Sequence, residues 1–155
     1  MGNAESFTRF IVEMQALLSS IDSHCAEVTR VETSDERLLA LREIARLAHA
    51  VAELAKAFDV DDLRSLAEAL ARSATDAVTD ANTTAGALRH DDALMPPGWH
   101  DTLDFMQWRV RRFASVGQLE LPTAHDLTRI KWLMRTLQTP LSDDHHFAAT
   151  AGLFS

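Results

Sequence analysis

Several residue types that particular folds and sites require are scarce in this sequence. It has one cysteine, five glycines and no tyrosine in 155 residues. A lone cysteine, Cys25, cannot form a disulfide within the chain, which excludes a disulfide-stapled fold. No apolar run approaches the roughly 18 residues that a membrane-spanning helix needs, and no charged-then-apolar leader opens the chain. We therefore expect a cytoplasmic protein without membrane association.

Sequence patterns that hold phosphates, metals or catalytic triads are also missing. There is no Gly-rich phosphate loop, Ser/His/Asp order or Cys/His zinc spacing. The acidic stretch 59–62 lacks the ligand spacing and glycine of a calcium loop, and is better suited to capping a helix. His90-Asp91-Asp92 has no second histidine at a fixed spacing nearby. We therefore predict no cofactor and no metal site of the usual kinds.

Negative charge is concentrated in the first half of the chain. The formal net charge is −8, and residues 1–80 contain eight Lys or Arg against fifteen Asp or Glu. Such a chain repels phosphate backbones. The basic cluster of Arg109, Arg111 and Arg112 lacks an aromatic stacking platform and is predicted to be a solvated helix face. Nucleic acid is therefore not an expected partner.

The residues that are abundant favour helices throughout. Apolar residues make up 46% of the chain, and they recur at spacings of three and four over residues 6–30, 34–58, 61–79, 99–116 and 124–138. A capping box, Thr33-Ser-Asp-Glu36, starts the second of these segments. We predict an all-α fold, an up-and-down bundle of four to five helices with residues 1–140 as a single domain. For the tail, residues 141–155, we expect disorder, with a metal site at His145-His146 as the alternative.

The periodicity also predicts which side chains share the core. Leu127 is predicted to face inward from the last segment, and Cys25 to be a small buried hydrophobe. Seven residues are predicted to be buried together: Leu18, Ile44, Val51, Leu66, Leu70, Met106 and Ile130.

One histidine stands out in the long pattern over residues 41–58. Leu41, Ile44 and Val51 fall on one side of that helix, whereas His49 projects at the border of the polar face. Its neighbours one turn away include the small residues Ala45 and Ala52, so another protein can approach the imidazole. A neutral imidazole, with an unperturbed pKa of about 6.5, is a good nucleophile at cellular pH.

These residues resemble a known family. The stretch Leu47-Ala-His49, followed by Phe58, Leu63, Leu66 and Leu70, is similar to the histidine phosphotransfer (HPt) domains, including those of chemotaxis-type histidine kinases. The resemblance covers residues 5–80, with residues 99–138 as further bundle helices. It implies that His49 carries a phosphoryl group in a two-component phosphorelay, between a histidine kinase and the aspartate of a response-regulator receiver domain.

The resemblance further implies how the partner docks and what the protein itself must supply. The receiver brings its own magnesium, so no cofactor or ATP site is needed, and the protein is at most a phosphotransfer intermediate. The receiver is expected to dock beside His49. Its footprint is predicted to comprise Arg42, Ala45, Arg46, His49, Ala52, Glu53 and Lys56.

Two positions depart from the family motif, which has lysine three residues and glycine four residues after the histidine. Here these positions hold Ala52 and Glu53. A carboxylate one turn from His49 repels a phosphoryl group, and Lys56 is the candidate replacement cation. Two alternatives therefore stay open: an HPt-like bundle that docks a receiver or kinase without phosphotransfer, and an unrelated helical interaction module.

Overall fold

The computed structural model describes residues 2–30, 33–83 and 96–138, which form helices and no strand. The predicted all-α helical bundle is confirmed. The tail at 141–155, with His145-His146, and the His90-Asp91-Asp92 stretch lie outside the described residues. The helices are α1 (Gly2–Arg30), α2 (Ser34–Ala57), α3 (Asp61–Thr83), α4 (Trp99–Val116) and α5 (Ala124–Leu137).

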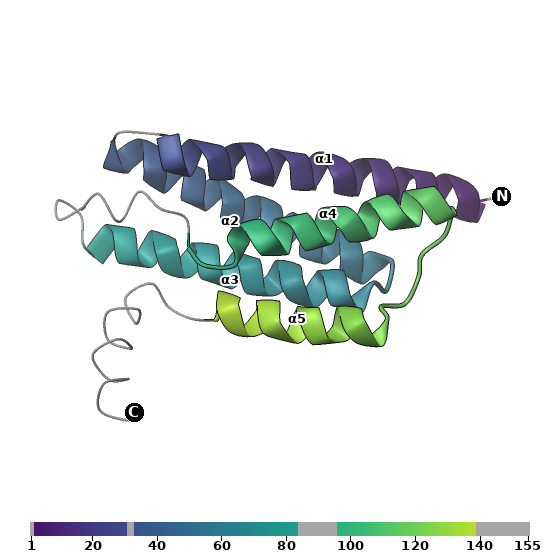
Figure 1. Ribbon diagram of the computed structural model, residues 1–155. Helices are drawn as coiled ribbons and strands as arrows, with labels where there is room; N and C mark the ends of the chain where they lie inside the picture. Colours follow the sequence, from purple (N-terminus) through teal and green to yellow (C-terminus); the bar gives the residue numbers. More distant parts are fainter. Residues whose placement is uncertain (1, 31–32, 84–95, 139–155) are drawn as a thin grey trace, which may run out of the picture.

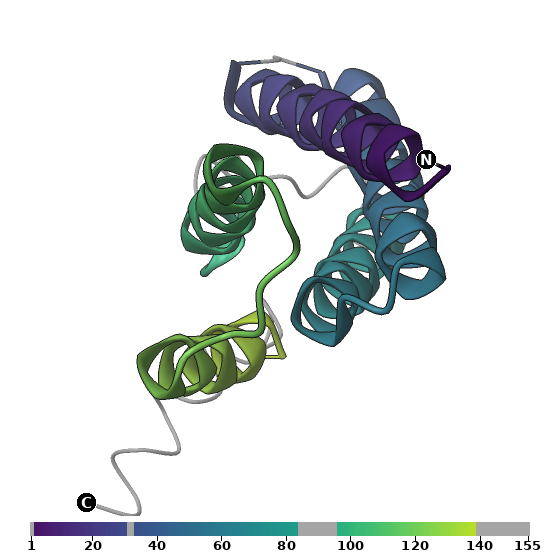
Figure 2. The ribbon, with the colours of Figure 1, turned by 90° about the vertical axis from the view of Figure 1, so that its right-hand side faces the viewer.

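Successive helices run in opposite directions (Figure 1). Helix α2 packs against both α1 and α3, whereas α4 contacts α1, α3 and α5, and α5 contacts α3 and α4. Seen end-on, α2 lies on one side of the bundle, and α4 and α5 lie on the other (Figure 2). The outer face of α2 and the outer faces of α4 and α5 therefore point in opposite directions.

The ends of the helices follow from local sequence chemistry. At the start of α2 the Thr33 hydroxyl oxygen accepts a hydrogen bond from the backbone N–H of Glu36 at 3.2 Å, which is half of the predicted capping box. At the start of α5, Thr123 and Asp126 form both halves of such a box. Gly98 precedes α4 with a φ of 88°, and a Cβ there would lie 2.8 Å from the Thr136 side chain. Only glycine permits this close approach between the start of α4 and the end of α5.

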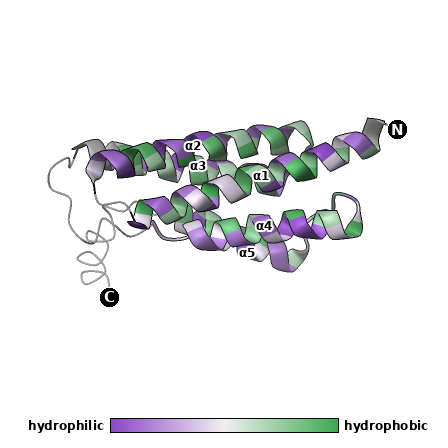
Figure 3. Ribbon diagram, turned by 90° about the horizontal axis from the view of Figure 1, so that it is seen from above, coloured by the Kyte–Doolittle hydropathy of each residue, from purple (hydrophilic) through white to green (hydrophobic). Residues whose placement is uncertain are grey.

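Each helix carries apolar and polar residues on different sides (Figure 3). The seven residues predicted to share the core are all buried, so the predicted period is confirmed. The prediction for Leu127 is wrong, because its side chain is 46% exposed. Ile130 and Leu137 face inward, as predicted, and Leu133 is buried with them. The buried face of α5 is thus rotated away from Leu127 relative to the face that the sequence pattern indicated.

Arg109 is also placed differently from the prediction of a solvated basic face. Its guanidinium is buried, with Nε donating to Asp62 Oδ2 at 2.7 Å and an Nη donating to the Glu120 carbonyl at 2.9 Å. The same group lies 4.7 Å from the centre of the Phe113 ring. Charged side chains are buried when they are paired and hydrogen-bonded in this way. Arg109 therefore joins α4 to α3 and to the connection before α5.

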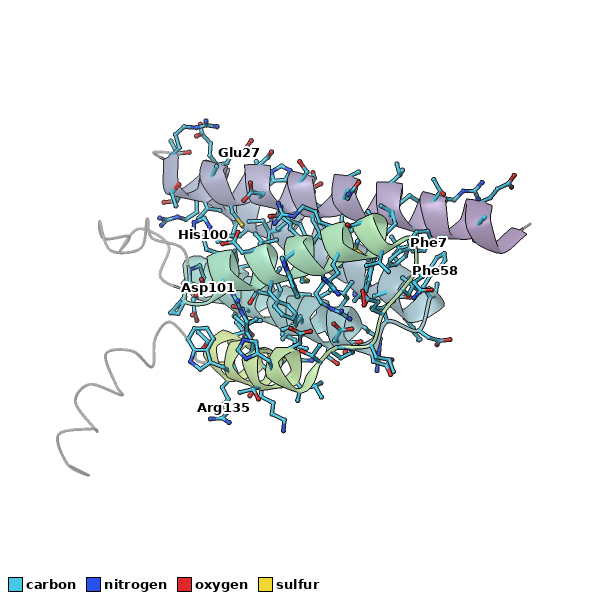
Figure 4. The ribbon with its side chains drawn as sticks, turned by 45° about the vertical axis from the view of Figure 1, so that its right-hand side comes forward. Phe7, Glu27, Phe58, His100, Asp101 and Arg135 are labelled. Carbon is cyan, nitrogen blue, oxygen red and sulfur yellow. The ribbon has the colours of Figure 1, made fainter. Side chains whose placement is uncertain are left out.

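A second polar contact holds α4 on α3. The indole Nε1 of the buried Trp99 donates to the Ser73 hydroxyl at 2.8 Å. At the opposite end of the bundle the Phe10 and Phe58 rings lie 4.6 Å apart, with Phe7 nearby (Figure 4).

None of the helices in residues 2–30, 33–83 and 96–138 combines the length and apolar character required to cross a bilayer.

Candidate functional site

His49 lies in the middle of α2, on the side turned away from the core. The imidazole is 72% exposed, while Ile44, Ala48 and Val51 on the other side of the helix are fully buried. Helical packing on either side fixes the backbone beneath the ring. The histidine is therefore presented on a rigid support with its ring open to solvent, as predicted from its place in the pattern.

Glu53 is the nearest charged neighbour of the imidazole. Its Oε1 lies 3.9 Å from His49 Nε2, one helical turn further along α2, and its side chain is 61% exposed. An exposed pair at this distance is too long for a hydrogen bond and attracts weakly, only while the imidazole is protonated. A phosphoryl group on Nε2 would instead meet a negative charge.

Arg46, one turn before His49, is already paired. Its guanidinium contacts the Glu43 carboxylate, with Nε donating at 3.1 Å. The hydrogen bond from Arg46 lowers the pKa of Glu43, and Glu43 correspondingly raises the pKa of Arg46. The sequence analysis missed Glu43, although a glutamate three residues before an arginine on a helix is a recognisable pair. Part of the positive charge expected beside His49 is therefore compensated within α2.

Six residues of the predicted footprint lie along one stripe of α2. Arg42, Arg46, Glu53 and Lys56 are exposed with His49, and Ala45 is half-buried at the edge of the stripe. Arg42 and Lys56 each lie seven residues from His49, which is about 10 Å along a helix. They therefore reach the imidazole only by extending along the helix surface.

Ala52, the seventh residue of the predicted footprint, lies outside this exposed stripe. Its side chain is only 3% exposed. Helix α2 packs against two helices, α1 and α3. Its buried face is therefore wider than that of a helix with one neighbour, and it includes Ala52. A partner that docks on α2 contacts at most the edge of this residue.

His49 lies apart from two open grooves of the described residues. One, of about 790 Å³, lies between the end of α1 and the start of α2, and the other, of about 470 Å³, lies beside the α2–α3 turn and the start of α5. Neither groove is lined by His49. Small ligands bind in concave sites, so an exposed histidine on a convex helix face suits a macromolecular partner.

Among the described residues, neither Cys25 nor a metal-binding cluster offers a competing site. Cys25 is buried in the core, and desolvation by burial, followed by the charge of Asp22, raises its pKa to about 12. Such a thiol is inert. Within residues 2–30, 33–83 and 96–138, no three His, Cys, Asp or Glu side chains lie close enough to hold a metal ion.

The chain matches no family model, no curated protein and no solved structure.

Proposed function

We propose that this protein is a histidine phosphotransfer protein, in which His49 accepts a phosphoryl group from, and returns it to, the receiver domain of a response regulator. The observation that carries the proposal is the 72% exposed imidazole in the middle of a helix whose other side is held in the core. The resemblance of residues 5–80 to HPt domains supports the same assignment. The bundle supplies the nucleophile and a docking surface for the receiver.

The chemistry requires little of the bundle beyond presentation of the ring. The lone pair on Nε2 of neutral His49 attacks phosphorus in the receiver's aspartyl phosphate, and a nitrogen–phosphorus bond forms. The bond from phosphorus to the aspartyl oxygen breaks, and the carboxylate leaves with that electron pair. The proton on Nδ1 stays on the ring. Because a mixed anhydride is the donor, exposure and docking geometry matter more than activation of the nucleophile.

A second candidate function is docking of a receiver or a histidine kinase without phosphotransfer. It is favoured by Glu53, whose carboxylate lies 3.9 Å from the nitrogen that would be phosphorylated. It is also favoured by Ala52, which places a methyl group within the packed face where the family has a lysine. In this alternative the α2 stripe binds the partner, and His49 serves as a contact.

Incubation with phosphorylated receiver domains from the source genome tests the proposal. Labelled aspartyl phosphate on the receiver is expected to yield an acid-labile label on this protein, and His49→Gln is expected to abolish it. The matched control is His125→Gln, the same change at an exposed histidine of α5. It should leave labelling intact.

Binding measurements on the same pairs separate the two candidates. A receiver that binds the wild-type protein with no label transferred would support docking alone. If no receiver or kinase from the genome binds or labels the protein, both candidates are wrong and the bundle serves an unrelated interaction.

A further inference from the structure

Two tryptophans on the far side of the bundle from His49 are exposed. Trp108 on α4 and Trp132 on α5 are 42% and 52% exposed, whereas Trp99 is fully buried. Single exposed apolar residues are common on soluble proteins, but neighbouring large ones mark interaction sites. The question is therefore whether these two tryptophans belong to one surface.

Contacts across α4 and α5 connect them. The Trp108 ring lies 6.0 Å from the Phe105 ring, and the Arg129 guanidinium of α5 lies 5.6 Å from the Phe105 ring. Trp132 follows Arg129 by one helical turn, and Arg112 follows Trp108 by one turn. Three exposed residues define the tryptophan surface, Trp108, Arg129 and Trp132, and the buried ring of Phe105 contacts two of them, Trp108 and Arg129.

The charge of this side of the molecule is opposite to that of the rest. Helices α4 and α5 carry six Lys or Arg and three Asp or Glu, of which Arg109 and Asp126 are buried, whereas α1, α2 and α3 carry eight and thirteen. The two acidic residues of α4, Asp101 and Asp104, lie in its first half, and its arginines lie in its second half. Arg135 is at the outer side of α5 near its end (Figure 4). The tryptophan surface thus combines aromatic area with local positive charge.

We propose that the tryptophan surface docks an acidic segment of a partner protein, one in which Asp or Glu alternates with apolar side chains. Tryptophan and arginine dominate the binding energy of protein interfaces. Arginine also pairs with carboxylates through two parallel hydrogen bonds. The apolar side chains of the segment cover the indole rings, and its carboxylates meet Arg129. Arg112 is already paired within the chain, because its Nε lies 3.2 Å from Glu120 Oε1.

The overall charge selects a short acidic segment over larger anionic partners. A nucleic acid or an anionic membrane meets the whole molecule, whose net charge is −8, and is repelled. A short segment senses only charges within a screening length of about 8 Å, where the local charge is positive. A second copy of the chain also brings −8, so self-association is disfavoured for the same reason.

The placement of this surface gives the bundle two independent docking sides. Helix α2, which carries the His49 stripe, lies on one side of the bundle, and α4 and α5, which carry the tryptophan surface, lie on the other (Figure 2). A receiver on α2 therefore leaves α4 and α5 accessible. This inference stands whether or not His49 is phosphorylated, because none of its observations involves α2.

A fluorescein-labelled peptide in which Glu and Asp are interspersed with Leu and Phe is the probe, and its Gln/Asn counterpart is the control. The acidic peptide should bind saturably, as measured by fluorescence anisotropy. Binding should also shift the tryptophan emission to the blue, because it covers the exposed indoles of Trp108 and Trp132. Trp99 is already buried and does not contribute to this shift. The Gln/Asn peptide should bind roughly tenfold more weakly or not at all. Trp132→Ala and Arg129→Glu should each weaken binding of the acidic peptide by roughly tenfold.

Leu39→Ala provides the matched control, since Leu39 is an exposed apolar residue of α2. It should leave peptide binding unchanged. The proposal is overturned if neither peptide binds, if both bind equally, or if Leu39→Ala weakens binding as much as Trp132→Ala does. Concentration-dependent self-association that Trp132→Ala abolishes would assign the surface to a second copy instead, and would also overturn it.

Discussion

Helices α1 to α3 and helices α4 to α5 differ in how many large apolar side chains they leave exposed. Among the large apolar residues of α1 to α3, Val12 and Leu39 are exposed. On the α4–α5 side the exposed set is larger and more aromatic: Trp108, Val116, Leu121, Leu127 and Trp132. The first three helices bury their apolar residues against one another and leave an acidic, mostly polar exterior. The last two leave apolar area at the surface, and this area includes the two tryptophans that we propose contact a partner.

Polar contacts add to the apolar packing of α4, whereas α5 buries fewer apolar side chains. Arg109 and Trp99 fix α4 to α3 through Asp62 and Ser73. Helix α5 packs against the bundle through three buried apolar side chains, Ile130, Leu133 and Leu137. Regions with few buried apolar contacts open at lower free energy than the core. We therefore expect α5 to be the first described helix to separate from the bundle.

The largest expected effect comes from breaking the buried ion pair between the two regions. Arg109→Met leaves the Asp62 carboxylate buried without its partner and should lower the free energy of unfolding by about 3–5 kcal/mol, measured by urea denaturation. The double variant Arg109→Met with Asp62→Leu should recover much of that loss, because no uncompensated charge remains. Equal destabilisation by the single and double variants would show that packing, and not charge, joins the regions.

A pair of equivalent truncations compares the two regions directly. Leu70→Ala in α3 removes a fully buried side chain and should cost about 4 kcal/mol, whereas Leu137→Ala in the last turn of α5 should cost about 2 kcal/mol. The difference is expected because the end of α5 can relax into the space that is left. Thermal or urea unfolding measures both values.

Cys25 reports whether the α5 change stays local. Its thiol is buried in the core with a pKa of about 12, so at pH 8 it should react with a thiol reagent only when α1 opens. Leu70→Ala should accelerate this reaction strongly and Leu137→Ala only slightly. If both variants accelerate labelling in proportion to their loss of stability, then α5 unfolds together with the core.

Sequence periodicity predicted the first region better than the second, for a physical reason. The long helices α1 to α3 each repeat their apolar residues over several turns, so the buried face is well determined. Helix α5 is short and carries apolar residues on more than one side, and the pattern could not distinguish Leu127 from Leu133. Arg109 was predicted wrongly because its burial depends on Asp62, which lies 47 positions earlier in the chain.

The candidate site shows a similar limit. The exposure of His49 and its alignment with Arg42, Arg46, Glu53 and Lys56 follow from helical geometry alone. The burial of Ala52 does not, because it depends on α2 contacting two helices at once. Nor did the sequence analysis recognise the tryptophan surface, since it joins residues of two helices that only the folded chain brings together.

A substitution on α2 alone should show whether the two docking surfaces act independently. Ala45→Arg adds a bulky side chain at the half-buried edge of the α2 stripe and should weaken binding of a cognate receiver by roughly tenfold. Folding stability should change by about 0.5 kcal/mol or less, as for most surface substitutions. Binding of the acidic peptide to the tryptophan surface should be unaffected, and a parallel loss of both would indicate a change in the whole bundle.

The smallest expected effect concerns the charge beside His49. Glu53→Gln removes the carboxylate that lies 3.9 Å from Nε2 while keeping the length of the side chain and its helix propensity. Because the pair is exposed and screened, the rate of phosphoryl transfer to His49 should rise only about two- to fivefold, with receiver affinity and stability nearly unchanged. Glu13→Gln, the same change at an exposed position of α1, is the control and should have no effect. A Glu53→Gln variant that binds a receiver and still takes up no phosphate would show that the carboxylate is not what prevents transfer, and would favour docking alone as the function of the α2 stripe.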